Sequence, residues 1–68
     1  MNKQEIIKFI ENEIKNHFKK HDKTKINSLK SIYYHINTEL IYILSKIKNI
    51  DYDTINNKLY NEYEKEQN

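Results

Sequence analysis

The chain contains neither glycine nor proline anywhere in its 68 residues. These two residues are the strongest breaks in secondary structure, and they supply many of the backbone conformations that tight turns need. Without them, turns with positive φ must use Asn or Asp, and helices joined by short polar connections are favoured. The absence of glycine also removes the phosphate-binding loop and the glycine-rich turn of nucleotide-binding proteins. The sequence therefore predicts an all-α fold and argues against a nucleotide-dependent enzyme.

Apolar residues recur with helical spacing in three segments, about 3–20, 25–49 and 53–66. The apolar stripe of the first segment consists of Ile6, Ile7, Ile10, Ile14 and Phe18. The second segment alternates steps of three and four, the heptad pattern of a coiled coil, over Ile26, Leu29, Tyr33, Ile36, Leu40, Ile43, Ile47 and Ile50. The stripe of the third consists of Tyr52, Ile55, Leu59 and Tyr63. We predict a single domain over residues 1–68, a three-helix up-down-up bundle with a long central helix.

Polar residues between these segments can begin new helices. Asp22 or Thr24 could cap the second helix, and Asp51 or Asp53 could cap the third. A break at Asn37-Thr38 would give four helices, because the threonine could cap a helix there. We favour one long helix, since the heptad register runs through this point unchanged.

The chain is short for a self-sufficient hydrophobic core. Small domains usually gain stability from disulfides, a metal ion or oligomerisation, and this chain has no cysteine. We therefore expect a homodimer or a docked protein partner. Lysine, isoleucine and asparagine supply half of the residues, and their codons are AT-rich. This composition favours an AT-rich genome, such as that of a low-GC bacterium, its phages and plasmids, or an AT-rich eukaryote.

No stretch of the sequence reaches the roughly 18 consecutive apolar residues of a membrane-spanning helix. The first apolar run is short and is cut by Lys8 and Glu11, unlike the core of a secretory signal peptide. The lack of cysteine fits a reducing compartment. We expect a cytoplasmic protein without a membrane partner.

The polar side chains form no catalytic or metal-binding pattern that sequence can identify. Glu13, His17 and His21 recur every four residues and share a helix face, which could bring two imidazoles to one zinc ion. Nearby lysines oppose a cation, and the zinc-protease motif His-Glu-x-x-His is missing. Glu11 and Glu13 are two residues apart and make a poor acid–base pair. We predict a non-enzymatic protein without catalytic residues, metal, cofactor or small-molecule substrate.

Four aromatic residues lie off or at the edge of the predicted core stripes, namely Phe9, Tyr34, Tyr42 and Tyr60. Tyr42 lies nearly opposite the central stripe, and Ile41 flanks it. Tyrosine is enriched at protein interfaces, so we assign partner binding to Tyr34, Ile41 and Tyr42. Scattered surface aromatics without a function are an equally good interpretation. The leading hypothesis is a protein–protein interaction module, an inhibitor, adaptor or immunity-type protein of phage or plasmid origin, which also binds itself.

Lysines are concentrated in residues 15–30, where six of them accompany a single aspartate. In an antiparallel hairpin of helices these residues crowd at one end, which could bind phosphates. The lysines concerned are Lys15, Lys19, Lys20, Lys23, Lys25 and Lys30. Arginine, which makes the commonest base-specific contact, is absent. The alternative function is a small nucleic-acid-binding accessory or regulatory protein. A helix-turn-helix around Asn37-Thr38 is a weaker variant of this hypothesis. The competing interpretation is that these lysines are an ordinary solvated surface.

Overall fold

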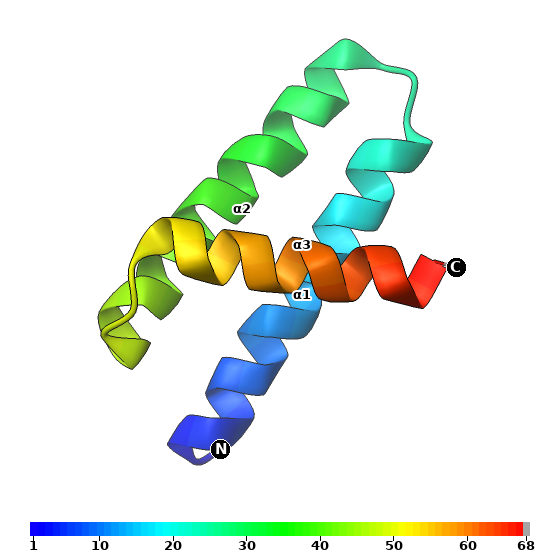
Figure 1. Ribbon diagram of the computed structural model, residues 1–68. Helices are drawn as coiled ribbons and strands as arrows, with labels where there is room; N and C mark the ends of the chain where they lie inside the picture. The colour runs from blue at the N-terminus through cyan, green and yellow to red at the C-terminus, as the bar shows by residue number, and fades with distance from the viewer. Residues whose placement is uncertain (68) are drawn as a thin grey trace.

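The computed structural model describes residues 1–67, which form three helices (Figure 1). Helix α1 spans Lys3–Lys23, α2 spans Asn27–Lys48 and α3 spans Tyr52–Gln67. The prediction of an all-α three-helix bundle whose central helix is the longest is confirmed. None of these three helices combines the length and the apolar character that crossing a membrane requires.

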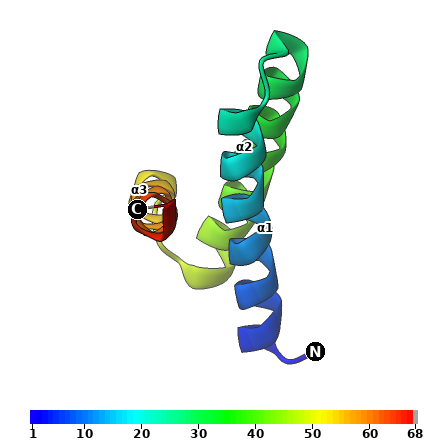
Figure 2. The ribbon, with the colours of Figure 1, turned by 90° about the vertical axis from the view of Figure 1, so that its right-hand side faces the viewer.

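Helices α1 and α2 form an antiparallel hairpin, and α3 lies across one face of it (Figures 1 and 2). In Figure 2, α3 is seen nearly end-on beside the two hairpin helices. This arrangement differs from the predicted up-down-up order, in which α3 would run alongside α2. Within the part of the chain that the structure describes, the opposite face of the hairpin carries no helix.

The turn between α2 and α3 explains how the chain changes direction. Asn49 ends α2 in the left-handed conformation, with φ of 54° and ψ of 46°. Asparagine tolerates this conformation better than most residues, so it replaces the glycine that commonly ends a helix. Asp51 then caps α3, as predicted, by accepting a hydrogen bond of 3.0 Å from the backbone N–H of Thr54.

The connection between α1 and α2 differs from the prediction. Neither Asp22 nor Thr24 caps α2, which begins without a side-chain hydrogen bond. Thr24 instead follows the last turn of α1, and its Oγ1 accepts a hydrogen bond of 3.2 Å from the backbone N–H of Ile26. The threonine therefore stabilises the connection and not the helix start.

Helix α2 is continuous through Asn37-Thr38. The Thr38 hydroxyl donates a hydrogen bond of 2.9 Å to the backbone carbonyl of Tyr34, one turn earlier. A threonine bonded in this way lies inside a helix and caps nothing. The four-helix alternative is wrong, and no turn is present here to form a helix-turn-helix.

The hydrophobic core lies where α3 crosses the hairpin. Its buried apolar side chains, among residues 1–67, are Ile7, Ile14, Ile41, Leu44, Ile55, Leu59 and Tyr63. Ile10, Phe18, Leu40, Ile47 and Tyr52 pack partly against them. The predicted stripes of α1 and α3 are confirmed, except that Ile6 is exposed.

Helix α2 turns a different face to the core than its heptad pattern predicted. Its buried residues are Asn37, Ile41 and Leu44. Ile36 and Ile43 directly precede two of these, so they lie about 100° around the helix from the core. The heptad positions that are exposed are Ile26, Ile36, Ile43 and Ile50. Helix α3 packs against the side of α2 that carries Ile41 and Leu44, so the exposed heptad positions on the other side of α2 have no helix against them.

Candidate functional site

The three residues assigned to partner binding do not form one surface. Ile41 is only 1% exposed and belongs to the core, so the prediction that it lies on the surface is wrong, while its role in partner binding stays a prediction. It lies three residues before Leu44 and therefore on the same helix face. Tyr34 and Tyr42 are accessible, with exposed fractions of 63% and 53%. The Lys46 ammonium lies 5.2 Å from the centre of the Tyr42 ring, in a cation–π contact.

An exposed apolar surface is present on α2, beside Tyr42. Ile36 and Ile43 lie seven residues apart on α2 and are 40% and 44% exposed, and Ile50, which is 38% exposed, lies two residues beyond the end of this helix. We call these three residues the open stripe. Glu39 and Lys46 flank it, and neither forms an ion pair among the described residues. The heptad spacing identified these isoleucines, but as core residues.

A buried polar link joins α1 to α2. The Nδ2 atom of Asn37 donates a hydrogen bond of 3.0 Å to the backbone carbonyl of Ile14. This fixes the orientation of the amide, so its Oδ1 atom accepts and the Nδ1 atom of His17, 2.9 Å away, donates. The His17 ring also stacks on Tyr33, with 5.9 Å between ring centres. His17 therefore has a packing role between the two hairpin helices.

His21, the second histidine of the zinc hypothesis, faces a single carboxylate. Its Nδ1 atom lies 3.4 Å from Asp22 Oδ1. Within residues 1–67, no three side chains of His, Asp or Glu are grouped so that they could hold a metal ion.

Lys15 belongs to an ion-pair network and not to the free basic end. Its ammonium lies 2.9 Å from Glu62 Oε1 and 3.3 Å from Glu66 Oε1, so it links α1 to α3. The hydrogen bond with Glu62 raises the pKa of Lys15 and lowers the pKa of Glu62. A second ion pair, between Lys48 Nζ and Glu11 Oε2 at 3.4 Å, joins the other end of the hairpin.

The remaining lysines of residues 15–30 belong to the last turns of α1, the connection to α2 and the first turns of α2. Lys30 is half-buried on the first turns of α2. The exposed members, none of which forms an ion pair with another described residue, are Lys19, Lys20, Lys23 and Lys25. We call these four the basic end. The hairpin therefore concentrates most of the predicted lysines, as expected for an antiparallel pair.

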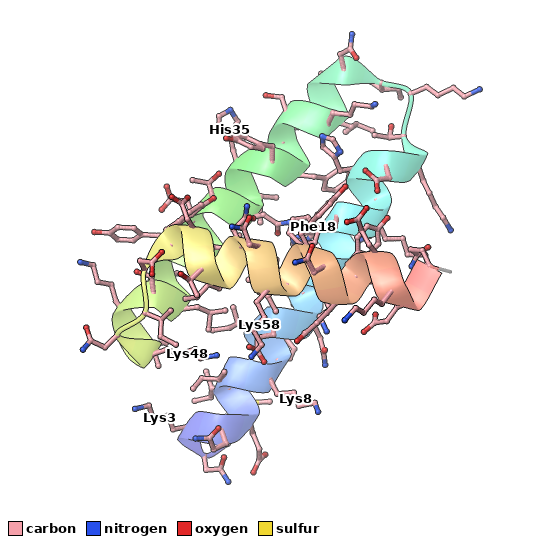
Figure 3. All side chains as sticks on the ribbon, viewed as in Figure 1. Lys3, Lys8, Phe18, His35, Lys48 and Lys58 are labelled. Carbon is pink, nitrogen blue, oxygen red and sulfur yellow. The ribbon has the colours of Figure 1, made fainter. Side chains whose placement is uncertain are left out.

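An aromatic cluster forms where α3 crosses α1, around Phe18 (Figure 3). The Phe18 ring lies 5.2 Å from the ring of Tyr60 and 5.8 Å from that of Tyr63. The Tyr63 hydroxyl donates a hydrogen bond of 2.7 Å to Asp22 Oδ2. Burial, assisted by this bond to a carboxylate, raises the pKa of Tyr63 to about 12. The bond ties the end of α1 to α3.

A cleft of about 400 Å³ opens beside this cluster, between all three helices. Its aromatic walls are Phe18, Tyr33, Tyr34, Tyr52 and Tyr60. Two carboxylates, Asp22 and Asp53, also line it. Sequence reasoning missed this cleft, because its residues come from three helices and share no spacing. The off-stripe positions of Tyr34 and Tyr60 were the only signal.

Comparisons with known protein families, curated proteins and solved structures found no match to this chain. What the protein does must therefore be inferred from its own surfaces. Three of them stand out, namely the open stripe, the basic end and the aromatic cleft.

Proposed function

We propose that the protein is a non-enzymatic helical interaction module that pairs with a second copy of itself through the open stripe of α2. The carrying observation is that Ile36 and Ile43 keep coiled-coil spacing on α2 while they remain exposed. The small core supports the same proposal. Among residues 1–67, seven apolar side chains are buried, whereas eleven large hydrophobic side chains are exposed. Pairing would remove part of this exposed apolar surface from water.

The charges beside the open stripe favour an antiparallel pairing centred on Ile43. In that register Ile43 faces Ile43 of the second copy, and Ile36 lies toward the C-terminal end of the partner's α2. Glu39 and Lys46 lie at equivalent heptad positions on either side of Ile43, so each would meet the opposite charge of the second copy. A parallel pairing would place Glu39 beside Leu44, which is buried within its own chain. Complementary charges therefore select the antiparallel arrangement.

The interface would extend beyond the open stripe itself. A stable dimer buries about 800 Å² on each partner. The accessible surface of one chain is 5042 Å², so such an interface would cover about one sixth of it. The half-buried Leu40 and Ile47, together with the flanking Glu39 and Lys46, would complete the area.

The test compares two adjacent residues of α2. Ile43→Lys and Tyr42→Lys make the same charge change at similarly exposed positions that point about 100° apart. In size-exclusion chromatography with light scattering, the wild type is expected at twice its mass of 8.4 kDa. Ile43→Lys should be monomeric and Tyr42→Lys should remain dimeric. A wild type that stays monomeric at high micromolar concentration, or dimers lost only with Tyr42→Lys, would refute the proposal.

A module of this kind suits an inhibitor, adaptor or immunity-type protein, of phage or plasmid origin, in which pairing presents a second surface to another protein. Tyr34 and Tyr42 stay accessible in a dimer that uses the open stripe. A pull-down with the Ile43→Lys and Tyr42→Lys variants would separate the two surfaces. Loss of a partner with only one variant would assign that partner to one side of α2.

The basic end supports a second candidate function, binding to nucleic acid. Four exposed lysines at one end of the hairpin can neutralise phosphates of any sequence. Log affinity should then fall against log salt with a slope of about −3.6 on duplex DNA, if each of the four lysines meets one phosphate. Lys15 is removed from this set, because Glu62 and Glu66 already hold it.

A matched pair of triple variants tests this candidate. The first changes Lys19, Lys20 and Lys23 to glutamate. The second changes Lys3, Lys8 and Lys58, of which the first two lie toward the opposite end of α1 (Figure 3). Both alter the net charge equally, so only position differs. Binding to a mixed-sequence duplex should be lost with the first variant alone. Equal losses of binding with both variants would show that net charge, and not the basic end, determines binding.

A further inference from the structure

The aromatic cleft has a composition opposite to that of the chain as a whole. The sequence has 12 lysines and no arginine, and none of these lysines lines the cleft. Five of the eight aromatic residues do line it. Its two charged lining residues, with histidine neutral, are Asp22 and Asp53. A chain of net charge +2 thus contains a local site that is aromatic and negative.

We infer that this cleft binds a basic side chain, arginine or lysine, of a protein partner. Aromatic ring faces attract organic cations, and the attraction grows when the cation is partly desolvated. A volume of about 400 Å³ is large enough for a guanidinium group and its aliphatic stem. The carboxylates supply the opposite charge and acceptor oxygen atoms for the N–H groups of a guanidinium group.

Asp22 is held ready for this role by its contact with α3. Its Oδ2 atom accepts the hydrogen bond from the buried Tyr63 hydroxyl, while its side chain stays 47% exposed. The Oδ1 atom has only a long contact of 3.4 Å to His21. Asp53, on the first turn of α3, is exposed and forms no ion pair with another described residue. Both carboxylates can therefore accept hydrogen bonds from a ligand.

The inference goes beyond the proposed self-association and does not depend on it. Neither Ile36 nor Ile43 lines the cleft, so a monomer and a dimer would both present it. A failure of one proposal would leave the other standing. Tyr34 and Tyr60 are the exposed aromatic walls of the cleft, and a cation site would explain why these two rings face water.

The test uses two blocked pentapeptides that differ only in a central arginine or its uncharged isostere citrulline. Amide chemical shifts of the labelled, full-length protein report binding by NMR. The arginine peptide should bind about tenfold more tightly or better, and the shifts should map to the residues that line the cleft. Equal binding of both peptides, or shifts confined to other surfaces, would overturn the inference. Binding of tetramethylammonium without binding of the arginine peptide would also overturn it, in favour of a small cation.

Two variants and one control locate the site. The double change Asp22→Asn with Asp53→Asn should weaken arginine-peptide binding by about tenfold, whereas Glu5→Gln with Glu13→Gln, an equal change of charge on α1, should not. Because Asp22→Asn alters the bond from Tyr63, Tyr34→Leu provides an independent test at a side chain outside the core. Unchanged binding in the Tyr34→Leu variant, with a native circular dichroism spectrum, would contradict the cleft assignment.

Discussion

The Nδ1 atom of His17 donates a hydrogen bond of 2.9 Å to the side-chain oxygen of Asn37. Asn37 is the one buried polar side chain among residues 1–67, and it also bonds to the Ile14 carbonyl. A buried polar side chain that must keep its partners restricts how two helices can slide past each other. The link therefore fixes the register of the α1–α2 hairpin, on which both the open stripe and the basic end depend.

Removing this link should destabilise the fold. Asn37→Ala leaves the His17 donor without its partner and should lower the free energy of unfolding by about 1–3 kcal/mol. Thr38→Ala, at the next residue, which is half-buried, is the control and should cost less than about 1 kcal/mol. Urea unfolding followed by circular dichroism measures both. Equal losses in the two variants would show that the buried link has no special role.

The reassignment of Ile41 from the surface to the core has its own test. Ile41→Ala removes buried apolar atoms and should lower the free energy of unfolding by about 2–5 kcal/mol. Tyr42→Ala, one residue later, should cost less than about 1 kcal/mol, because half of its side chain already faces water. Thermal unfolding of the two variants compares them directly. A larger loss of stability with Tyr42→Ala than with Ile41→Ala would contradict the burial of Ile41 in the core.

The ion pair between α1 and α3 predicts a dependence of stability on acid pH. The pKa of Glu62 is lowered in the folded state by Lys15. Its carboxylate therefore stabilises the fold above about pH 4.3, the value for an unfolded glutamate, and this stabilisation is lost as the pH falls further. Because the Glu62 side chain is 41% exposed, we expect an effect below about 1 kcal/mol. Glu62→Gln should remove this part of the acid dependence, and Glu64→Gln, at a carboxylate that forms no ion pair within residues 1–67, should retain it; urea midpoints measured at several pH values distinguish them.

Tyr63 predicts the opposite behaviour in alkali. Its pKa is raised to about 12, so the folded protein holds the phenol proton more tightly than the unfolded chain does. Stability from this group is complete below about pH 10, the ordinary value for tyrosine, and is lost as the pH rises toward 12. Ultraviolet titration of tyrosinate should show the late ionisation of Tyr63, which Tyr63→Phe removes. If the late phase persists in Tyr63→Phe, another tyrosine is responsible.

Local sequence patterns were sufficient to predict the three helices, but not to predict which face of each helix is buried. The spacing of Ile14 and Leu59 placed both in the core, and Asp51 was recognised as a cap from its position alone. In α2, the apolar residues cover more than one face, so periodicity could not decide between Ile43 and Leu44. That choice depends on where α3 crosses the hairpin, which is a long-range property.

The cleft shows the same limit more strongly. Its walls come from three helices, and Tyr33, Tyr52 and Asp22 are brought together only by the crossing of α3. Their sequence separations carry no period that could have revealed a site. Tyr34 was correctly expected to be accessible. Its position off the apolar stripe of its helix is visible in the local sequence and does not depend on how the helices pack.

The most direct test of self-association uses the absence of natural cysteine. In an antiparallel pairing centred on Ile43, the two copies of this residue face each other, within the reach of a disulfide bond. Under mild oxidation, Ile43→Cys should therefore form a covalent dimer that a reductant reverses, while Tyr42→Cys should stay monomeric on a denaturing gel. Failure of Ile43→Cys to crosslink, or equal crosslinking of Tyr42→Cys, would contradict pairing through the open stripe.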